Sequence, residues 1–507
     1  MCFPFLLLYL ADDTISCPLF PPYYHRRKHR LNPLRTIAEQ ANVLFGTSGV
    51  RGLVASLSDN VCYAYTQAFL ASVAGGSAPI IVGHDLRPSS PRIAAACLQA
   101  IQDAGRSAVF VGAVPTPALA HLCALRQAPG IIVTGSHIPF DRNGIKFYRA
   151  DGEISKQDEH LILDASVAVP VGLSPAPLPP VDPAALDAYI ARYTSFFDQQ
   201  ILAGKRVALY EHSSVARDVL RQILERLGAE VLSLGRTDTF VPIDTEAVRQ
   251  EDIEQARSWA TQHRFDAILS TDGDADRPLI GDENGIWLRG DVVGILCAQY
   301  LQADVAVTPV SSNTAVEQCG SFKRVLRTKI GSPYVIAAMQ AASDAATVVG
   351  YEANGGFLLG SDITRAGHTL TALPTRDAVL PMLALMALAR IRNLPLSALP
   401  ATLPPRFTAS DRIQQVPVEA SRRLIAALRG DAAQAGALMA PASGTIVSQD
   451  ETDGLRLTFE AGDVVHIRPS GNAPELRCYA EAATQERAQQ LCSTCLARIV
   501  VAVQDLG

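Results

Sequence analysis

The sequence has few charged residues, no excess of basic ones and no long uninterrupted apolar run. Charged residues make up 19% of its 507 positions, and the formal net charge is -6. A nucleic-acid-binding surface is therefore not expected, and an anionic ligand would have to be attracted by positive charge gathered in a cleft. The apolar stretch 378–391 contains Pro381 and is too short to span a bilayer, so we expect a buried helix there.

The ten cysteines lack the paired spacing of a zinc or redox site. One C-x-x-C motif, Cys492 to Cys495, falls in a helical pattern at 486–503 and has no second pair or histidine partner. A structural zinc is therefore not expected, and a thioredoxin-like role lacks the strand that should precede the motif. Reduced thiols and a cytoplasmic location are the simplest expectation.

The first 35 residues differ from the rest of the chain. An apolar run at 3–10 is followed by the basic run His25 to Arg30, the reverse of the charge order in a signal peptide. The apolar run is also too short to cross a membrane. We therefore predict that residues 1–35 form an atypical, disordered N-terminal extension, and that the protein has no membrane partner.

The remainder alternates short apolar runs with helical periodicity, which indicates parallel sheets covered by helices. After Arg406 the pattern changes to short strands joined by tight turns, which is typical of an antiparallel sheet. Proline-rich stretches at 170–183 and 394–406 indicate domain boundaries. A chain of this length allows three or four domains.

We predict an α/β protein of four domains around a central cleft. Three doubly wound domains with mixed sheets are expected to share one topology, and a smaller C-terminal α+β domain follows them. Each domain contributes one loop with functional residues. The predicted bounds are 36–180 with a serine loop, 181–288 with an acidic loop, 289–400 with a carboxylate and amide loop, and 401–507 with an arginine loop.

The acidic loop places three carboxylates at alternate positions after a strand-like run at 265–270. Asp272, Asp274 and Asp276 can converge on one divalent ion. An all-oxygen ligand set favours magnesium, manganese or calcium over zinc. Arg277 beside them suits a phosphate oxygen, so one loop could hold a metal and the phosphoryl group that the metal polarises.

Three other interpretations of this loop stay open from its residues alone. An EF-hand would explain Glu283 at the twelfth position, but Arg277 stands at the sixth, where that loop turns on glycine. An aspartyl nucleophile of the haloacid dehalogenase type also follows a strand, but it normally has threonine or valine where Asp276 stands. The third is a solvated acidic turn, so partners elsewhere in the chain must decide.

Four further loops contain residues suited to a phosphorylated sugar. The run 131–139 leads from a buried strand into a turn with Ser136 and His137, a nucleophile beside a base, and Lys146 follows. The flanking residues are not those of a Gly-x-Ser-x-Gly hydrolase turn. The other three are a dianion-binding loop with Arg468, Ser470, Gly471, Asn472 and Arg477, a loop for sugar hydroxyls with Glu352, Asn354 and Gly356, and a flexible turn with Arg51.

These five motifs, in this order, resemble the α-D-phosphohexomutase family of phosphomannomutases and phosphoglucomutases. The resemblance extends from about Leu44 to Leu506. It implies that Ser136 carries a phosphoryl group and, with the three aspartates, contacts one magnesium ion. It also implies two sets of substrate contacts, to sugar hydroxyls from Glu352, Asn354 and Gly356, and to the non-reacting phosphate from Arg468, Ser470, Gly471, Asn472 and Arg477.

The implied reaction is a reversible phosphoryl transfer on hexose phosphates, here mannose 6-phosphate to mannose 1-phosphate. It passes through a hexose 1,6-bisphosphate, which also acts as an activator. Such a transfer depends on positioning and charge neutralisation, which magnesium, Arg51 and Arg277 would supply. His137 and Lys146 are the candidates for moving the hydroxyl proton, and Lys146 would do so best if neighbouring cations lowered its pKa. The expected partner is the small-molecule substrate, bound by a monomer or a homodimer.

The chain departs from the family pattern at several positions. Ile138 replaces an asparagine, Ser332 a histidine or aspartate, and Asn472-Ala473 the usual Thr-Glu. The sugar loop reads Glu-Ala-Asn-Gly-Gly instead of Glu-x-Ser-Gly-His. We expect mannose phosphate ahead of glucose and glucosamine phosphates, and a non-catalytic sugar-phosphate-binding protein is the alternative. The enzyme interpretation requires Ser136 and the three aspartates to meet at one shared ion.

Overall fold

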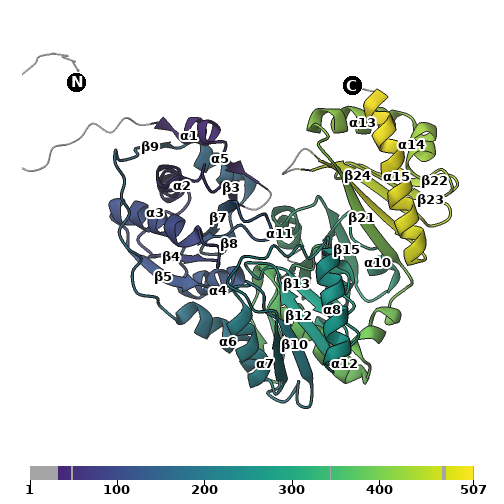
Figure 1. The fold of residues 1–507 in the computed structure, drawn as a ribbon, viewed down its shortest axis with the longest axis horizontal. Helices are drawn as coiled ribbons and strands as arrows, with labels where there is room; N and C mark the ends of the chain where they lie inside the picture. The colour runs from purple at the N-terminus through teal and green to yellow at the C-terminus, as the bar shows by residue number, and fades with distance from the viewer. Residues whose placement is uncertain (1–31, 47–48, 343, 471–474, 506–507) are drawn as a thin grey trace, which may run out of the picture.

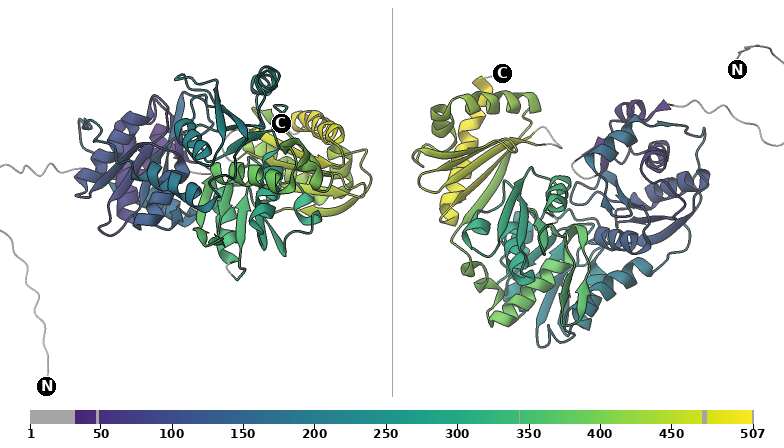
Figure 2. Two further views of the ribbon diagram at one scale, coloured as in Figure 1. Left: turned by 90° about the horizontal axis from the view of Figure 1, so that it is seen from below. Right: turned by 180° about the vertical axis from the view of Figure 1, so that it is seen from behind.

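The computed structural model describes residues 32–46, 49–342, 344–470 and 475–505, so almost all of the predicted extension 1–35 lies outside it. Four larger sheets define domains I to IV in chain order. Figure 1 shows the domains along an arc from domain I in purple to domain IV in yellow, and the reverse view in Figure 2 agrees. Domains I and IV lie at the two ends, and domains II and III join them.

Domain I is built on a mixed sheet with a fully buried central strand. β4 (Ile80–His84) pairs in parallel with β5 (Ala108–Ala113) and β6 (Gly130–Val133), and β6 pairs antiparallel with β7 (Arg142–Arg149). The continuous apolar run of β4 is typical of a parallel strand covered on both faces. The other elements are α1 (Leu34–Ala41), β2 (Leu44–Phe45), β3 (Val50–Leu53), α2 (Asp59–Ser72), α3 (Ser90–Asp103), α4 (Thr116–Arg126), β8 (Gly152–Glu153) and α5 (Lys156–Asp164).

Domains II and III repeat the order of four consecutive strands of domain I, β4 to β7. The first strand lies between the second and the third, in parallel with both, and the fourth strand is antiparallel to the third. The expected shared topology is therefore confirmed. The strands are β10 (Arg206–Tyr210), β11 (Glu230–Leu234), β12 (Ala267–Thr271) and β13 (Pro278–Gly281) in domain II, and β14 (Val305–Pro309), β15 (Arg324–Thr328), β16 (Val348–Tyr351) and β17 (Phe357–Leu359), extended by β20 (Leu373–Asp377), in domain III.

The helix expected over 378–391 is α12 (Val379–Arg392). Its residues from Val379 to Ala389 are all buried, which confirms a buried helix. Among the described helices, none is long and apolar enough by itself to cross a membrane, and α12 meets the length and composition test only together with Leu396–Thr402, across a bend of 87°. The other helices of domains II and III are α6 (Ala184–Phe196), α7 (Arg217–Arg226), α8 (Gln250–Gln262), α9 (Gly290–Leu301), α10 (Ala315–Gln318), α11 (Ser332–Ala341), η1 (Leu396–Ala398) and η2 (Pro400–Thr402).

Domain IV has the antiparallel sheet expected after Arg406, in the order β21-β25-β24-β23-β22. Three helices bury an apolar core against one face of this sheet. Side chains of β25 such as Arg477 and Glu481 alternate with core residues and belong to the opposite, polar face. The elements are β21 (Phe407–Gln414), α13 (Val418–Gly430), α14 (Ala432–Met439), β22 (Ile446–Asp450), β23 (Leu455–Phe459), β24 (Val464–Pro469), β25 (Glu475–Ala482) and α15 (Gln485–Asp505).

The predicted functional loops occupy the same connection in domains I to III. Ser136 lies between β6 and β7, the three aspartates lie between β12 and β13, and Glu352 lies between β16 and β17. In each case this is the connection from the third strand to the fourth. Two small pairs complete the fold, β1 (Asn32–Pro33) with β9 (Ser166–Val167), and β18 (Ile363–Arg365) with β19 (His368–Leu370).

Candidate active site

Ser136 and the aspartate loop meet at the junction of domains I and II. The Ser136 hydroxyl donates a hydrogen bond to Asp272 Oδ2 at 2.5 Å, and the two residues are 1% and 0% exposed. Ser136 has a left-handed backbone (φ 51°), which is unfavourable for a residue with a Cβ. Its N–H donates to Thr134 Oγ1 at 2.8 Å. The fold thus brings the predicted nucleophile to the predicted metal ligands.

Asp272, Asp274 and Asp276 form a compact group of carboxylates. One oxygen from each lies within 4.8 Å of the others, and all three side chains are buried. Asp274 Oδ1 and Asp276 Oδ1 are buried and accept no hydrogen bond within the described part of the chain. Such oxygens fit a hard divalent cation. The loop connects two strands, which excludes an EF-hand, since that motif needs a helix on each side.

The pKa values of Asp272 and Asp276 are shifted in opposite directions by their different surroundings. Burial, followed by the charges of Asp274 and Asp276, raises the pKa of Asp272 well above its usual range. Burial also opposes ionisation of Asp276, but Arg376 and Lys146 outweigh burial and lower its pKa. A bound cation would therefore find Asp276 ionised and would favour ionisation of Asp272.

Lys146, on β7, reaches the aspartate loop from domain I. Its ammonium group donates to Asp274 Oδ2 and Asp276 Oδ2, both at 2.7 Å. Burial favours the neutral amine, but these two carboxylates outweigh burial and raise the pKa of Lys146. The condition named for proton transfer by Lys146, a pKa lowered by neighbouring cations, is therefore not met, because carboxylates outweigh the nearby Arg376.

His137 differs from Lys146 in its charge. Its Nδ1 lies 3.2 Å from the Ser136 hydroxyl. Burial, followed by repulsion from Arg277 and Arg51, lowers the pKa of His137 well below its usual range, so the ring is neutral at pH 7. A neutral imidazole can accept a proton, whereas the Lys146 ammonium can only donate one.

Arg51 and Arg277 add positive charge beside the carboxylates. Arg51 lies on β3, opposite Gly144 of β7. Burial and repulsion from Arg277 lower the pKa of Arg51 to about 10. Arg277 Nε lies 3.5 Å from Asp276 Oδ1. An anion between the two guanidinium groups would relieve their repulsion, so this is a suitable place for phosphate oxygens.

Sequence reasoning missed Arg376, which joins the aspartate loop to the loop that contains Glu352. Arg376 lies on β20 and is 3% exposed. Its Nη2 donates to Asp276 Oδ2 at 2.8 Å and its Nη1 to Glu352 Oε2 at 3.0 Å. No motif surrounds it. The available signal was a charged Arg-Asp pair in a short strand, Leu-Pro-Thr-Arg-Asp, directly before the apolar helix α12.

Asn354 and Gly356 shape the sugar loop. Asn354 Oδ1 accepts a hydrogen bond from the Gly356 N–H at 2.9 Å, and the Asn354 carbonyl accepts one from Thr245 of domain II at 2.6 Å. A Cβ on Gly356 would lie 2.5 Å from Cδ of Arg376. Glycine at this position therefore leaves room for Arg376.

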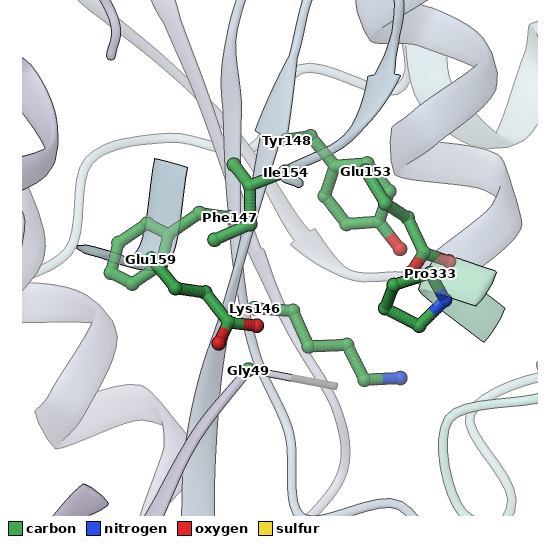
Figure 3. Close-up of a pocket in the computed structure, with 8 residues that line it drawn as sticks. All are labelled: Gly49, Lys146, Phe147, Tyr148, Glu153, Ile154, Glu159 and Pro333. Atoms are coloured by element: carbon green, nitrogen blue, oxygen red, sulfur yellow. The ribbon is translucent and has the colours of Figure 1, made fainter. Parts of the chain in front are cut away.

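Ser332, one of the departures from the family pattern, is bound by domain I. Its hydroxyl donates to Glu153 Oε2 at 3.0 Å, and Thr375 donates to Glu153 Oε1 at 2.7 Å. Figure 3 shows Glu153 beside Pro333 in the wall of a small cavity that Lys146 also lines. The start of α11 is thereby attached to the part of domain I that contains Lys146.

The predicted phosphate-binding residues lie in domain IV. Arg468 on β24 lies opposite Arg477 on the neighbouring strand β25. The Ser470 N–H donates to the Glu475 carbonyl at 2.8 Å. Arg468 Nε lies 3.3 Å from Asp453 Oδ1. The two remaining residues predicted for this loop, Gly471 and Asn472, lie outside the described residues.

Four sequence profiles of phosphoglucomutase/phosphomannomutase match consecutive parts of the chain. They are α/β/α domain I at residues 42–168, domain II at 187–285, domain III at 289–407 and the C-terminal domain at 409–497. Their order is that of the four sheets.

Known proteins agree with these matches. A phosphomannomutase from Salmonella muenchen is 47% identical over 468 residues, 91% of this chain and 97% of that protein. One from Sinorhizobium fredii is 44% identical over 466 residues, 89% of this chain and 98% of that protein. A solved phosphoglucomutase/phosphomannomutase family protein from Burkholderia thailandensis has the same fold, with a TM-score of 0.72 at 20% identity over 91% of this chain and 97% of that one. The chain therefore belongs to the phosphoglucomutase/phosphomannomutase family.

Proposed function

We propose that this protein is a phosphomannomutase that interconverts mannose 6-phosphate and mannose 1-phosphate through a phosphoserine at Ser136. The main observation is the 2.5 Å hydrogen bond from Ser136 to Asp272, which puts a phosphorylatable hydroxyl at the edge of the carboxylate group. Interconversion of hexose phosphates agrees with membership of the family. The preference for mannose rests on 47% and 44% identity with two phosphomannomutases.

In the proposed reaction, the bond between phosphorus and Ser136 Oγ breaks as phosphorus bonds to a hydroxyl of the bound sugar phosphate. That hydroxyl loses a proton and Ser136 regains one, so the products are a hexose 1,6-bisphosphate and a free serine. After the bisphosphate turns round, its other phosphoryl group returns to Ser136 by the reverse step. Neutral His137, 3.2 Å from Oγ, can take and return the proton, and the Lys146 ammonium is a second acid.

The remaining residues of the proposed site bind the metal ion and the substrate. Asp272, Asp274 and Asp276 would hold a magnesium ion, which neutralises charge on the transferring phosphoryl group when it is bound. The other contacts are Arg51 and Arg277 at that phosphoryl group, Glu352, Asn354 and Gly356 at the sugar hydroxyls, and Arg468, Ser470 and Arg477 at the distal phosphate.

Mass spectrometry and a turnover assay test this proposal. We expect a phosphate on Ser136 and magnesium-dependent formation of mannose 1-phosphate, stimulated by a hexose 1,6-bisphosphate. Ser136→Ala should abolish the modification and lower kcat by at least about 10³-fold. Ser421→Ala is the matched control, because Ser421 is a buried serine of domain IV.

Two results would contradict the proposal. An unmodified Ser136 without turnover, even after addition of bisphosphate, would indicate a non-catalytic sugar-phosphate-binding protein. A covalent phosphate on Asp272 would indicate an aspartyl nucleophile instead.

Relative rates on mannose, glucose and glucosamine 6-phosphates test the choice of sugar. We expect the highest kcat/KM for mannose 6-phosphate. Asn354→Ser, which introduces the residue usual in the family loop, should change the ratio among the three sugars more than it changes the best rate. An unchanged ratio would show that the loop from Glu352 to Gly356 does not select the sugar.

A further inference from the structure

Arg87 is a buried arginine that no step of the proposed reaction uses. It lies in the loop after β4 and is 1% exposed. Its Nε lies 3.4 Å from Asp85 Oδ2, and the same carboxylate oxygen accepts a hydrogen bond from the Gly135 N–H. Its two terminal nitrogens donate to four backbone carbonyls, those of Ser136 (2.9 Å), Ile138 (2.5 Å) and Pro139 (2.8 Å) in the Ser136 loop and that of Arg142 (2.9 Å) at the start of β7.

These contacts determine the backbone of the Ser136 loop. A guanidinium group presents its N–H donors in fixed directions, so four carbonyls bound to one group restrict the loop to one arrangement. That arrangement includes the unfavourable left-handed conformation of Ser136. Gly135 lies directly against the guanidinium, since a Cβ there would be 2.5 Å from Arg87 Cζ.

The same contacts affect the electrostatics around Ser136. Each of the four carbonyls directs the negative end of its dipole at Arg87. A phosphoryl group on Ser136 would carry close to two negative charges, so carbonyls released from Arg87 and turned toward it would repel it. Arg87 therefore keeps these dipoles directed at itself.

Phe240 of domain II covers a face of the Arg87 guanidinium. Arg87 Cζ lies 4.0 Å from the centre of the Phe240 ring, in cation–π contact. The ring is also close to the aspartate loop, because a Cβ on Gly273 would lie 3.4 Å from Phe240 Cε2 and 2.8 Å from the Ser136 carbonyl oxygen. Phe240 thus lies against Arg87 and beside the aspartate loop, which itself lies against the Ser136 carbonyl.

We propose that Arg87, covered by Phe240, is a positioning residue for phosphoryl transfer, which holds the Ser136 loop in the arrangement that presents Oγ to the aspartate loop. This inference rests on the proposed function of Ser136. Both terminal nitrogens of Arg87 already donate to backbone carbonyls, so we assign it no role in binding substrate or metal. Its loss should therefore lower kcat and leave KM nearly unchanged, because the substrate is bound by other loops.

Two variants test Arg87 by different routes. Arg87→Lys keeps the charge but cannot reach four carbonyls, and we expect kcat to fall about 100-fold. Phe240→Leu keeps every hydrogen bond of Arg87 and removes only the aromatic face, and we expect kcat to fall about fivefold. KM for mannose 6-phosphate should stay nearly constant in both. Phe240→Leu keeps the test decisive if Arg87→Lys folds poorly.

Arg327→Lys is the matched control. Arg327 donates to three backbone carbonyls of domain III, those of Pro309, Ser312 and Asn313, and to the Glu317 carboxylate. It has the same kind of contacts as Arg87 but holds a loop without reacting groups. Its replacement should lower thermal stability and leave kcat unchanged.

Two further measurements distinguish a positioning role of Arg87 from a contribution to stability alone. The rate at which glucose 1,6-bisphosphate phosphorylates Ser136 in a single turnover should fall in parallel with kcat. Amide hydrogen exchange of residues 134–143 in the unphosphorylated protein should become faster in Arg87→Lys and Phe240→Leu, and not in Arg327→Lys. The inference is overturned if Arg87→Lys loses no more kcat than the control, or if loop exchange is unchanged in both variants. Absence of phosphoserine and of turnover in the unaltered protein would instead overturn the proposed function.

Discussion

The two ends of the candidate site are built differently. At the reacting end, Ser136, Lys146 and Asp276 are at most 4% exposed. Hydrogen bonds of 2.5 to 2.7 Å join them and their neighbours across the junction of domains I and II. At the proposed phosphate-binding end, the side chains of Arg468 and Arg477 are 13% and 31% exposed.

The attachments of the domains differ in the same way. One apolar core runs through domains II and III, whereas domain IV has a core of its own. Domain IV meets domain III through polar contacts, in which Glu481 accepts hydrogen bonds from Thr314, and Asp453 accepts one from the Ile330 N–H at 2.9 Å. Polar interfaces of this kind separate more easily than apolar ones. Phosphoryl transfer needs fixed groups, whereas a substrate that must enter, turn and leave needs a phosphate site that can open.

The largest loss of catalytic activity should follow removal of one charge at the reacting end. Asp274→Asn keeps the size of the side chain but removes a ligand charge and a partner of Lys146, so we expect kcat to fall about 10³-fold and magnesium affinity to fall at least about tenfold. Steady-state kinetics and titration calorimetry with magnesium measure the two effects. Asp282→Asn, a buried aspartate of the same domain, is the control. A loss of kcat below tenfold would mean that Asp274 does not hold the metal.

A smaller loss of catalytic activity should follow when Arg376, which links the reacting end to the sugar loop, is replaced by a shorter side chain. In the Arg376→Lys variant, the single ammonium group cannot reach both Asp276 and Glu352. We therefore expect kcat to fall about 100-fold and KM to rise as well. Arg192→Lys is the control, since Arg192 is also buried but donates to Thr371. If only KM changed, Arg376 would belong to the substrate contacts alone.

At the phosphate-binding end the effect should be on binding. Arg468→Lys keeps the charge but loses the forked geometry that suits a phosphate, so we expect KM to rise about tenfold while kcat changes only slightly. Steady-state kinetics with mannose 6-phosphate measure this. A fall in kcat larger than the rise in KM would contradict the difference between the two ends.

The smallest effect at neutral pH concerns the stability of domain IV. Burial lowers the pKa of His466 to about 4, and its Nε2–H donates to the Asp453 carbonyl. The unfolded histidine has a pKa of about 6.5, so the unfolded state binds more protons between these values. The contribution of His466 is therefore complete above about pH 6.5 and decreases as the pH falls toward 4, by about 3 kcal/mol in total.

Denaturant unfolding at pH 7 and pH 5 checks this expectation. His466→Gln should lose less stability between the two pH values than the unaltered protein. His121→Gln applies the same test to a histidine of domain I, because burial also lowers the pKa of His121 to about 4. Equal acid sensitivity of His466→Gln and the unaltered protein would contradict the role of His466.

The sequence predicts well what depends on local patterns. The apolar stretch 378–391 becomes the buried helix α12, and the run at 265–270 leads into the aspartate loop through β12. Ser136, the three aspartates and Glu352 could be found because each lies in a loop with its own residue pattern. The shared topology of three domains could be expected from the repeated alternation of strands and helices.

What the sequence did not predict depends on long-range contacts. Arg87 and Arg376 stand in no motif, and their roles come from loops that the fold brings to them. Ser332 was recognisable as a departure from the family, but its partner Glu153 lies in another domain. The direction of the Lys146 pKa shift could not be predicted either, because it depends on which charges lie nearest after folding.

Ser136, the aspartates and Glu352 occupy one equivalent connection in three similar domains. Such an arrangement is what repeated duplication of an ancestral unit would leave, with each copy specialised for one task. With the roles proposed above, substitutions in the β16–β17 connection would change which sugar is accepted, while the connections that carry Ser136 and the aspartates stay unaltered.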